Sequence, residues 1–357
     1  MEKVLDLLSL VANEKGLPFE EVKETFKRSI IKTAKKIIGD IDIEVEIKDS
    51  ELKIYQIFEV RNDDLSLSNP EKYFYLDEAK EFDENAQIGD RLKVELDLSK
   101  LGRSGAMALQ KEFEREITKL LENEIYRKLI SKLYTIVSGE VVKVDSQENT
   151  WIELDGVKGV LLRRNRIKGE KFEAGNVLKA LLKYVHFDTK KGITIELSRT
   201  HPKFLEKLIE AAVPEVRDSI IKIHSSSRIP GIRSKIAVSS LNSKIEPIGT
   251  VIGKNGVRIN AVSNELNGEN IDIIEYSHKP EIFVARALSP AIIKNVNVDK
   301  KKGIAIVEVD TEQKAKAIGK NGINITLASM LTKYKIELKN AKQKTTDTTK
   351  LESLFKI

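Results

Sequence analysis

Cysteine is absent from this chain of 357 residues, and histidine occurs only four times. The absence of cysteine excludes disulfide bonds, thiol nucleophiles and cysteine-ligated zinc. The histidines, His186, His201, His224 and His278, are scattered, so none has the H-x-x-x-H spacing of a helical zinc site. No serine or carboxylate lies in a recognisable catalytic motif. We therefore expect no metal, no cofactor and no enzymatic activity.

Long apolar runs are also missing. Charged residues interrupt the apolar segment at residues 1–15, which argues against a signal peptide. No later segment is apolar over the ~20 residues that a membrane helix needs. Hydrophobic residues make up 41% of the chain and charged residues 32%, as in globular domains. We expect a cytoplasmic protein of two, three or more domains that has no membrane partner.

The charge of the chain is unevenly distributed. Residues 1–100 contain 16 Lys and Arg but 24 Asp and Glu, a balance of −8. The remaining residues contain 45 and 31, a balance of +14. An acidic front and a basic rear predict two different partners, and a polyanion such as a nucleic acid is the candidate for the basic part.

Residues 1–133 predict an α/β domain, because helical and alternating apolar patterns follow one another. In order, the expected elements are helices over 1–15 and 18–38, strands over 41–47, 52–60 and 89–98, and a long helix over 104–133. The acidic stretch 77–85 lacks the glycine and the spacing of an EF-hand loop. We expect a solvated loop there.

Residues 134–199 predict a small β-barrel of the OB type, because five β-rich runs fit into so short a segment. The expected strands are 135–144, 150–155, 157–162, 177–187 and 192–197.

Residues 200–345 contain an internal repeat. Segments 200–278 and 279–345 share one order of elements, helix, two strands, helix, a Gly-Lys-Asn-Gly loop, helix and strand. Residues 346–357 are expected to form a tail.

The repeated loop has the chemistry to hold nucleic acid. Its glycines allow close approach of another backbone, the amides of the following helix attract phosphate, and its lysine adds positive charge. It is not an ATP-binding P-loop, because the segment "GTVIGKN" has the wrong spacing and no Ser or Thr after the lysine. Two copies in the same α/β order resemble the KH module, whose G-x-x-G loop clamps about four nucleotides of a single strand. The helix-first, strand-last order resembles the prokaryotic variant, the type II KH domain.

An OB-type barrel followed by two KH modules resembles the NusA family of bacterial transcription elongation, termination and antitermination factors. The matching stretches include "RIPGIRSKIAV", "IEPIGTVIGKNGVRINAVSNELNGENIDII", "AIGKNGINITLAS" and, at the front, "LSLVANEKGLPFEEVKETFKRSIIKTAKK". The resemblance implies that residues 1–133 dock on RNA polymerase near the RNA exit channel. It implies that the barrel is an S1 domain and that barrel and KH modules together hold nascent single-stranded RNA. The protein would modulate pausing, termination and antitermination as a monomer, with other antitermination factors as further partners.

The residues expected to contact RNA come from the loops, the barrel and one strand connection. The loop candidates are Gly253, Lys254, Asn255, Gly256, Gly319, Lys320, Asn321 and Gly322, with Arg258 and Asn324 on the helices that follow. Trp151 either stacks on a base or belongs to the barrel core. Arg163 and Arg164 stand where many S1 domains have a histidine, which favours phosphate binding or guanidinium stacking. Arg228 and Arg233 form either a basic rim beside the first KH sheet or a solvated strand connection.

Two other functions remain open at this level. A ribosome-associated protein or RNA chaperone could use the same modules without the front domain. A phosphorolytic exonuclease also joins S1 and KH modules, but it needs a catalytic domain, and residues 1–133 are too short and lack a plausible acidic active site.

Overall fold

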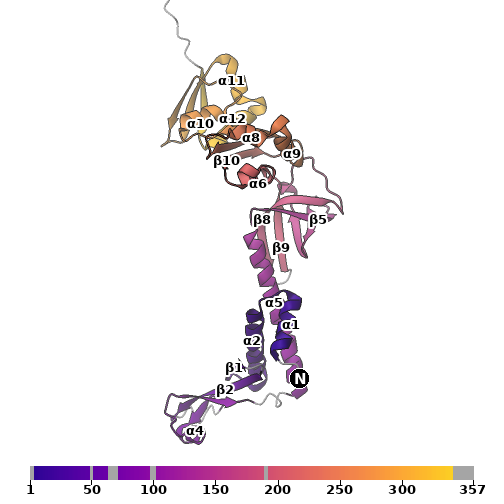
Figure 1. Cartoon of the computed structure of the whole chain (residues 1–357), viewed down its shortest axis with the longest axis vertical. Helices are drawn as coiled ribbons and strands as arrows, with labels where there is room; N and C mark the ends of the chain where they lie inside the picture. Colours follow the sequence, from indigo (N-terminus) through magenta and orange to yellow (C-terminus); the bar gives the residue numbers. More distant parts are fainter. Residues whose placement is uncertain (1–3, 49–50, 63–70, 97–101, 189–191, 341–357) are drawn as a thin grey trace, which may run out of the picture. The chain divides into compact units, whose positions relative to one another are not determined.

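A computed structural model describes residues 4–48, 51–62, 71–96, 102–188 and 192–340. The chain divides into two units, residues 1–128 and 129–357 (Figure 1). The predicted tail, 346–357, lies outside the described residues.

The first unit combines helices with a four-stranded sheet. Its elements are α1 (Val4–Lys15), α2 (Phe19–Ile38), β1 (Asp42–Lys48), β2 (Glu51–Arg61), β3 (Tyr73–Tyr75), α4 (Leu76–Phe82), β4 (Arg91–Glu95) and α5 (Gly102–Ser131), which runs on past residue 128. Strand β2 is central, with β1 and β4 antiparallel and β3 parallel to it. Leu8, Val22 and Ile117 form a core between α1, α2 and α5.

The acidic stretch 77–85 is not a solvated loop throughout, because α4 occupies most of it. Two acidic residues, Asp77 and Glu78, lie in its first turn, where the helix dipole favours negative charge. Phe74 stacks on Phe58 at 4.1 Å and on Phe82 at 5.2 Å between ring centroids, so an aromatic stack ties the helix to β2 and β3. The expectation of a loop was wrong for this reason.

The second unit begins with a closed five-stranded barrel in the order β5-β6-β7-β9-β8. Its strands are β5 (Ile136–Val144), β6 (Thr150–Leu154), β7 (Val157–Leu161), β8 (Val177–Asp188) and β9 (Gly192–Ser198), which confirms the predicted barrel. A Cβ at Gly159 would lie 2.8 Å from Ile152 Cγ1 and 3.0 Å from Ile195 Cγ1. A side chain at this position would therefore crowd the barrel interior, which explains the glycine.

Two three-stranded sheets follow, and they share one topology. The first module contains α6 (Pro202–Ala212), α7 (Pro214–Arg217), β10 (Ile221–Ile229), β11 (Arg233–Ser240), α8 (Pro247–Ile252), α9 (Val257–Glu265) and β12 (Asn270–Glu275). The second contains α10 (Pro280–Ala287), β13 (Asn295–Asp299), β14 (Ile304–Val309), α11 (Thr311–Ile318), α12 (Ile323–Thr332) and β15 (Lys335–Asn340). In each sheet the first two strands are antiparallel and the last two parallel, so the predicted duplication extends to the strand pairing.

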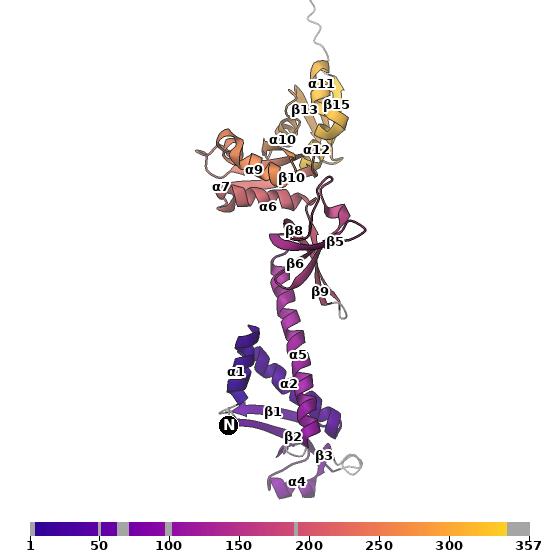
Figure 2. The ribbon, with the colours of Figure 1, turned by 90° about the vertical axis from the view of Figure 1, so that its right-hand side faces the viewer.

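The two modules pack against each other through one face of the first sheet. Ala237 and Ile274 of the first module belong to the same buried cluster as Val284, Leu288 and other residues of the second. Figure 2 shows α10 and α12 of the second module beside β10 of the first. Ser225 and Ser227 of β10 donate hydrogen bonds to carbonyl oxygens of α12 at 3.2 and 2.8 Å. The two modules thus share a core and cross-module hydrogen bonds.

Candidate RNA-binding surface

The two Gly-Lys-Asn-Gly loops have almost identical backbones. The first glycine has φ/ψ of 77°/165° in Gly253 and 75°/172° in Gly319, and the asparagine has 54°/24° in Asn255 and 53°/26° in Asn321. The last glycine is left-handed in both copies, at φ 74° and 73°. Positive φ at three of four positions explains why two are glycine and one is asparagine, the residues that adopt this region most easily.

Each loop presents a lysine and the start of a helix to solvent. Lys254 and Lys320 are exposed, and neither has an ion-pair partner among the described residues. Helices α9 and α12 begin directly after the loops, at Val257 and Ile323. The first amide of each helix donates to the carbonyl oxygen of the loop lysine. The positive end of the helix dipole still favours an anion there, so each loop combines it with an exposed lysine.

The fifth residue after the first glycine supports the loop. A Cβ at Gly253 would lie 2.8 Å from Arg258 Cγ, and a Cβ at Gly319 would lie 2.7 Å from Asn324 Cβ. Arg258 donates to the carbonyl oxygen of Thr250 at 2.8 Å and to Glu215 at 2.9 Å. Its guanidinium therefore binds back to the module, whereas the sequence suggested that it projects toward RNA.

Asn324 is buried, with 4% of its surface exposed. Its side-chain amide donates to the carbonyl oxygens of Leu288 and Ala317, each at 3.1 Å. The expectation that Asn324 contacts RNA was wrong in this structure, because its donors close the loop from inside. It is the counterpart of Arg258 in the second module.

The cations of the strand connection 228–235 differ in exposure, since Arg228 and Lys235 are buried while Arg233 is partly exposed. The side chain of Arg228 is 1% exposed, and its Nε donates to both oxygens of Glu269 at 2.8 and 2.9 Å. Arg233 forms a two-point contact with Asp272, with both distances 2.9 Å. Lys235 is fully buried between Asp272 and the carbonyl oxygen of Ser289, and burial lowers the pKa of its ammonium group. Carboxylates distant in sequence pair with all three cations. The predicted basic rim was wrong for the buried Arg228, whereas the side chain of Arg233 is 36% exposed.

The barrel offers a different kind of surface. Trp151 on β6 is half-buried and lies outside the barrel core cluster. Its indole Nε1 donates to Asp145 at 3.1 Å, and this hydrogen bond lowers the pKa of the Asp145 carboxyl. With Val142, Lys143 and Lys158 it lines an open cavity of about 380 Å³. Trp151 is therefore partly buried at the barrel surface, where its side chain lines this cavity.

Arg163 and Arg164 lie on a short 3₁₀ turn after β7 and are both exposed. Arg163 Nε lies 3.2 Å from Glu148 at the surface, and its side chain is 69% exposed. Exposed pairs of this kind exchange readily with other anions. Both arginines remain candidates for phosphate contact.

Asp145 and Glu215 are the residues that sequence patterns missed. Asp145 orients the indole of Trp151 and Glu215 holds Arg258. Asp145 lies only six residues before the tryptophan, in the turn between two predicted strands, and that proximity was the available signal. Glu215 is 43 residues from its partner, so no local pattern marks it.

Comparisons with known proteins agree with this architecture. Family models describe a NusA N-terminal domain at residues 3–123, a NusA-like first KH domain at 199–276 and a NusA-like second KH domain at 280–346. A transcription termination/antitermination protein NusA of Helicobacter pylori is 40% identical over 366 aligned positions, covering 94% of this chain and 92% of the relative. The chain belongs to the NusA family.

Other NusA proteins match along nearly the whole chain. The relative from Thermus thermophilus is 34% identical, covering 94% of this chain and 89% of its own length. The relative from Bacillus subtilis is 29% identical, covering 95% and 91%. Both carry the name of a transcription termination/antitermination protein, which describes a transcription factor rather than an enzyme. The predicted NusA resemblance and the predicted fold class, with a long helix, an S1-like barrel and two KH domains, are confirmed.

In the described part of the chain, no helix has both the length and the apolar character to span a membrane. In the same residues, no three His, Asp or Glu side chains come together as a metal-binding group.

Proposed function

We propose that this protein is a transcription termination and antitermination factor that binds RNA polymerase through residues 1–133 and nascent single-stranded RNA through its barrel and KH modules. The main observation behind the proposed RNA binding is the repeated loop. Two exposed Gly-Lys-Asn-Gly loops have the same backbone angles within a few degrees, and each places a lysine before a helix start. Membership of the NusA family and the acidic composition of residues 1–100 support the proposed binding to RNA polymerase.

The mechanism is competition between RNA conformations. Backbone amides and Lys254 or Lys320 hold phosphates, while Trp151 offers a ring face to a base of the same strand. Because the two KH modules share a core, the second contact is intramolecular once the first has formed, which raises the avidity for a long strand. RNA held in this way is unavailable for hairpin formation, and this changes pausing, termination and antitermination. No bond in the RNA is made or broken.

The test measures binding to two partners, RNA polymerase and single-stranded RNA. Full-length protein and residues 1–133 are titrated with core RNA polymerase, because the first unit has buried clusters of its own. The Lys254→Asp/Lys320→Asp variant is titrated with single-stranded RNA at several salt concentrations. We expect fragment and variant to bind polymerase, and the variant to bind RNA with a slope against log salt reduced by about two.

The control reverses two charges elsewhere. Lys300 and Lys301 are exposed and lie in the turn after β13, so Lys300→Asp/Lys301→Asp changes the net charge equally without touching a loop. If this control loses RNA as strongly as the loop variant, net charge rather than the loops binds RNA. If residues 1–133 do not bind polymerase while the full-length protein still binds RNA, the barrel and KH modules serve a ribosomal or RNA-chaperone role. Degradation of RNA by purified protein with Mg²⁺ and phosphate would instead favour an exonuclease.

A further inference from the structure

A crevice of about 290 Å³ opens at the junction of the two KH modules, apart from the Gly-Lys-Asn-Gly loops. We call it the junction crevice. Its walls come from β10, from the segment after β12, from α10 and from the end of α12, elements that lie together in both views (Figures 1 and 2). Its main lining residues are His224, Tyr276, His278, Phe283, Lys333 and Tyr334. One water takes about 30 Å³ of liquid, so the space can accept a planar ring system.

Aromatic rings form one side of the junction crevice. His224 and Tyr276 are stacked with centroids 3.7 Å apart and planes 8° from parallel. Tyr276 makes edge contacts with His278 and Phe283, both at 5.1 Å. His224 Nε2 lies 2.8 Å from Ser239 Oγ, and this hydrogen bond holds the imidazole in place. Among the described residues, no further ring is stacked on the other face of His224, so the stack ends there.

One lysine lines the junction crevice beside these rings, and a second lies close to His224. Lys333 lines the junction crevice and Lys222 lies two residues before His224, and both are exposed. Neither has an ion-pair partner in the described part of the chain, whereas the nearby Lys335 lies 3.0 Å from Glu337. Burial and the charge of Lys222 lower the pKa of His224, so its ring is neutral near pH 7. The combination is an uncharged aromatic stack with Lys333 at the edge of the crevice and Lys222 close to His224.

We propose that the junction crevice is a further single-stranded RNA site, in which a base stacks on His224 and Lys333 contacts its phosphate. Proteins that bind single-stranded nucleic acid commonly stack its bases on aromatic rings and contact its phosphates with nearby cations. This inference rests on the proposed function, and it adds a contact that does not use a G-x-x-G loop.

Helix α12 connects the new site to the second loop. Gly322 of that loop precedes its first residue, and Lys333 follows its last. A helix of 10 residues is about 15 Å long, a distance that a few nucleotides span. One strand can therefore contact the second loop and the junction crevice together, which makes the crevice contact intramolecular.

The first experiment observes the histidine rings of the full-length protein by NMR. The chain has only four histidines, so the ring signals of His224 and His278 can be assigned by substitution. The probes are a single-stranded RNA long enough to cover both KH modules and, separately, uridine monophosphate. We expect both signals to shift when the RNA is added. The proposal would be overturned if neither signal shifts at saturating RNA. It would also be overturned if the signals shift with uridine monophosphate but not with the RNA.

The second experiment measures RNA affinity of variants. We expect His224→Ala to weaken binding of the long RNA about tenfold, the typical loss of one stacked base. We expect Lys333→Ala to weaken it about threefold and to lower the salt slope by about one. The matched control, Lys335→Ala, removes a lysine that already has a carboxylate partner and should change little. Because His224→Ala also removes the contact with Ser239, Lys333→Ala tests the site without disturbing the stack.

The outcomes separate this inference from the proposed function. If Lys254→Asp/Lys320→Asp loses RNA while His224→Ala and Lys333→Ala bind as the unaltered protein does, the loops bind RNA and the junction crevice does not. If the loop variant itself keeps full affinity, the proposed RNA function fails whatever the crevice variants do.

Discussion

At the residue scale, the two KH modules stabilise one loop geometry with different side chains. Arg258 supports the first loop through Thr250 and Glu215, and Asn324 supports the second through carbonyl oxygens from its own module. Both pack against the first glycine of their loop. The loop backbone is therefore conserved between the copies, while the means of holding it is not.

The glycines of the second loop give a first prediction. A methyl group at Gly319 would lie 2.7 Å from Asn324 Cβ and 3.0 Å from its backbone nitrogen, but at Gly322 it would meet no atom within 4 Å. Both have positive φ, a cost of about 1–2 kcal/mol for alanine. We expect Gly319→Ala to destabilise the second unit by on the order of 1–2 kcal/mol more than Gly322→Ala, because crowding adds to the same backbone strain. Calorimetry of the two full-length variants measures this, and equal transitions would contradict it.

Arg228 and Glu269 give a second prediction. Both side chains are buried and joined by two hydrogen bonds. Removing one partner leaves a buried charge, which typically costs about 3–5 kcal/mol. We expect Glu269→Gln or Arg228→Met to lower the unfolding temperature of the second unit markedly. The double variant Arg228→Met/Glu269→Met should recover part of the loss, and denaturation of all three decides whether the pair or only its packing matters.

Trp151 gives a third prediction. It is the only tryptophan in the chain, so the tryptophan fluorescence of the protein comes from this residue alone. We expect RNA binding to quench its fluorescence, since the ring lines an open cavity. Trp151→Ala should weaken binding by about 1–3 kcal/mol, the range for one stacked base. Trp151→Phe retains a ring without the hydrogen bond to Asp145 and should lose less. Unchanged fluorescence at saturating RNA would place the RNA elsewhere on the barrel.

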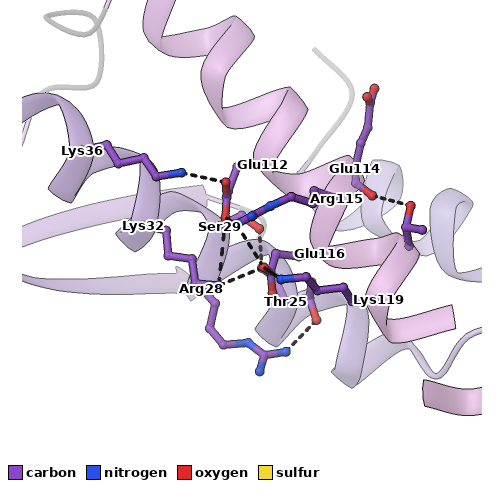
Figure 3. Close-up of polar contacts among 11 residues, drawn as sticks. Thr25, Arg28, Ser29, Lys32, Lys36, Glu112, Glu114, Arg115, Glu116 and Lys119 are labelled. Atoms are coloured by element: carbon purple, nitrogen blue, oxygen red, sulfur yellow. Dashed lines mark hydrogen bonds and ion pairs between the residues drawn. The ribbon is translucent and has the colours of Figure 1, made fainter. Parts of the chain in front are cut away.

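At the scale of elements, helices α2 and α5 of the first unit are joined by charges as well as by a core. Figure 3 shows Lys32 and Lys36 of α2 pointing toward Glu112 and Glu116 of α5. Lys32 lies 2.9 Å from Glu116, and Lys36 lies 3.0 Å from Glu112. Both carboxylates are largely withdrawn from water, with side chains 7% and 11% exposed. Such pairs stabilise the contact only while the carboxylates are ionised.

This cluster gives a fourth prediction, a pH dependence. The hydrogen bond from Lys32, with help from Lys119, lowers the pKa of Glu116 to about 2. Because the folded pKa lies below the unfolded one, the stabilisation is complete above about pH 4.5 and is lost as pH falls toward 2. We expect Glu116→Gln to destabilise the first unit by on the order of 2–3 kcal/mol at pH 7. The difference should shrink between pH 4.5 and 3, as measured by denaturation.

The control for this prediction is Glu114→Gln on the same helix. Glu114 is exposed. Among the described residues, its carboxylate accepts a hydrogen bond only from Gln110 Nε2, at 3.0 Å. Its substitution should change stability little at any of these pH values. A pH-independent loss in Glu116→Gln would show that packing rather than ionisation matters there.

At the scale of the whole molecule, the important feature is that the loops proposed to contact RNA are repeated on connected modules. Arg199, with a side chain 5% exposed, donates to Glu170 of the barrel region at 2.9 Å and to Glu265 of the first KH module at 3.0 Å. The KH modules in turn share a core. The contacts of a long strand should therefore be coupled.

Coupling gives a fifth prediction. On an RNA that spans both KH modules, Lys254→Asp and Lys320→Asp should each weaken binding, and the double variant should lose the avidity altogether. On an RNA long enough for only one module, the single variants should each have a smaller effect, because the other loop can bind instead. Titrations with the two lengths test this. Equal losses on both lengths would mean that the loops act independently.

Much of this molecule was predictable from local patterns. Apolar spacing predicted α2 and the five barrel strands, because helices and strands impose periods of 3.6 and 2 on the residues they bury. The repeated Gly-Lys-Asn-Gly predicted two loops of one geometry, because few other residues adopt positive φ. Helix α4 was missed since a helix of 7 residues is too short for a period, and aromatic rings from β2 and β3 hold it.

The amino-acid sequence by itself determined the longer helices and strands, their order, the two loops and the family, because each depends on neighbours along the chain. Only the tertiary structure decided which polar side chains face a ligand. Arg228 lies 41 residues from Glu269, and Asn324 lies 36 residues from Leu288. Whether an arginine binds RNA or a buried carboxylate depends on which group folding brings within hydrogen-bond distance, since an ion pair forms wherever the opposite charge is close and water is excluded.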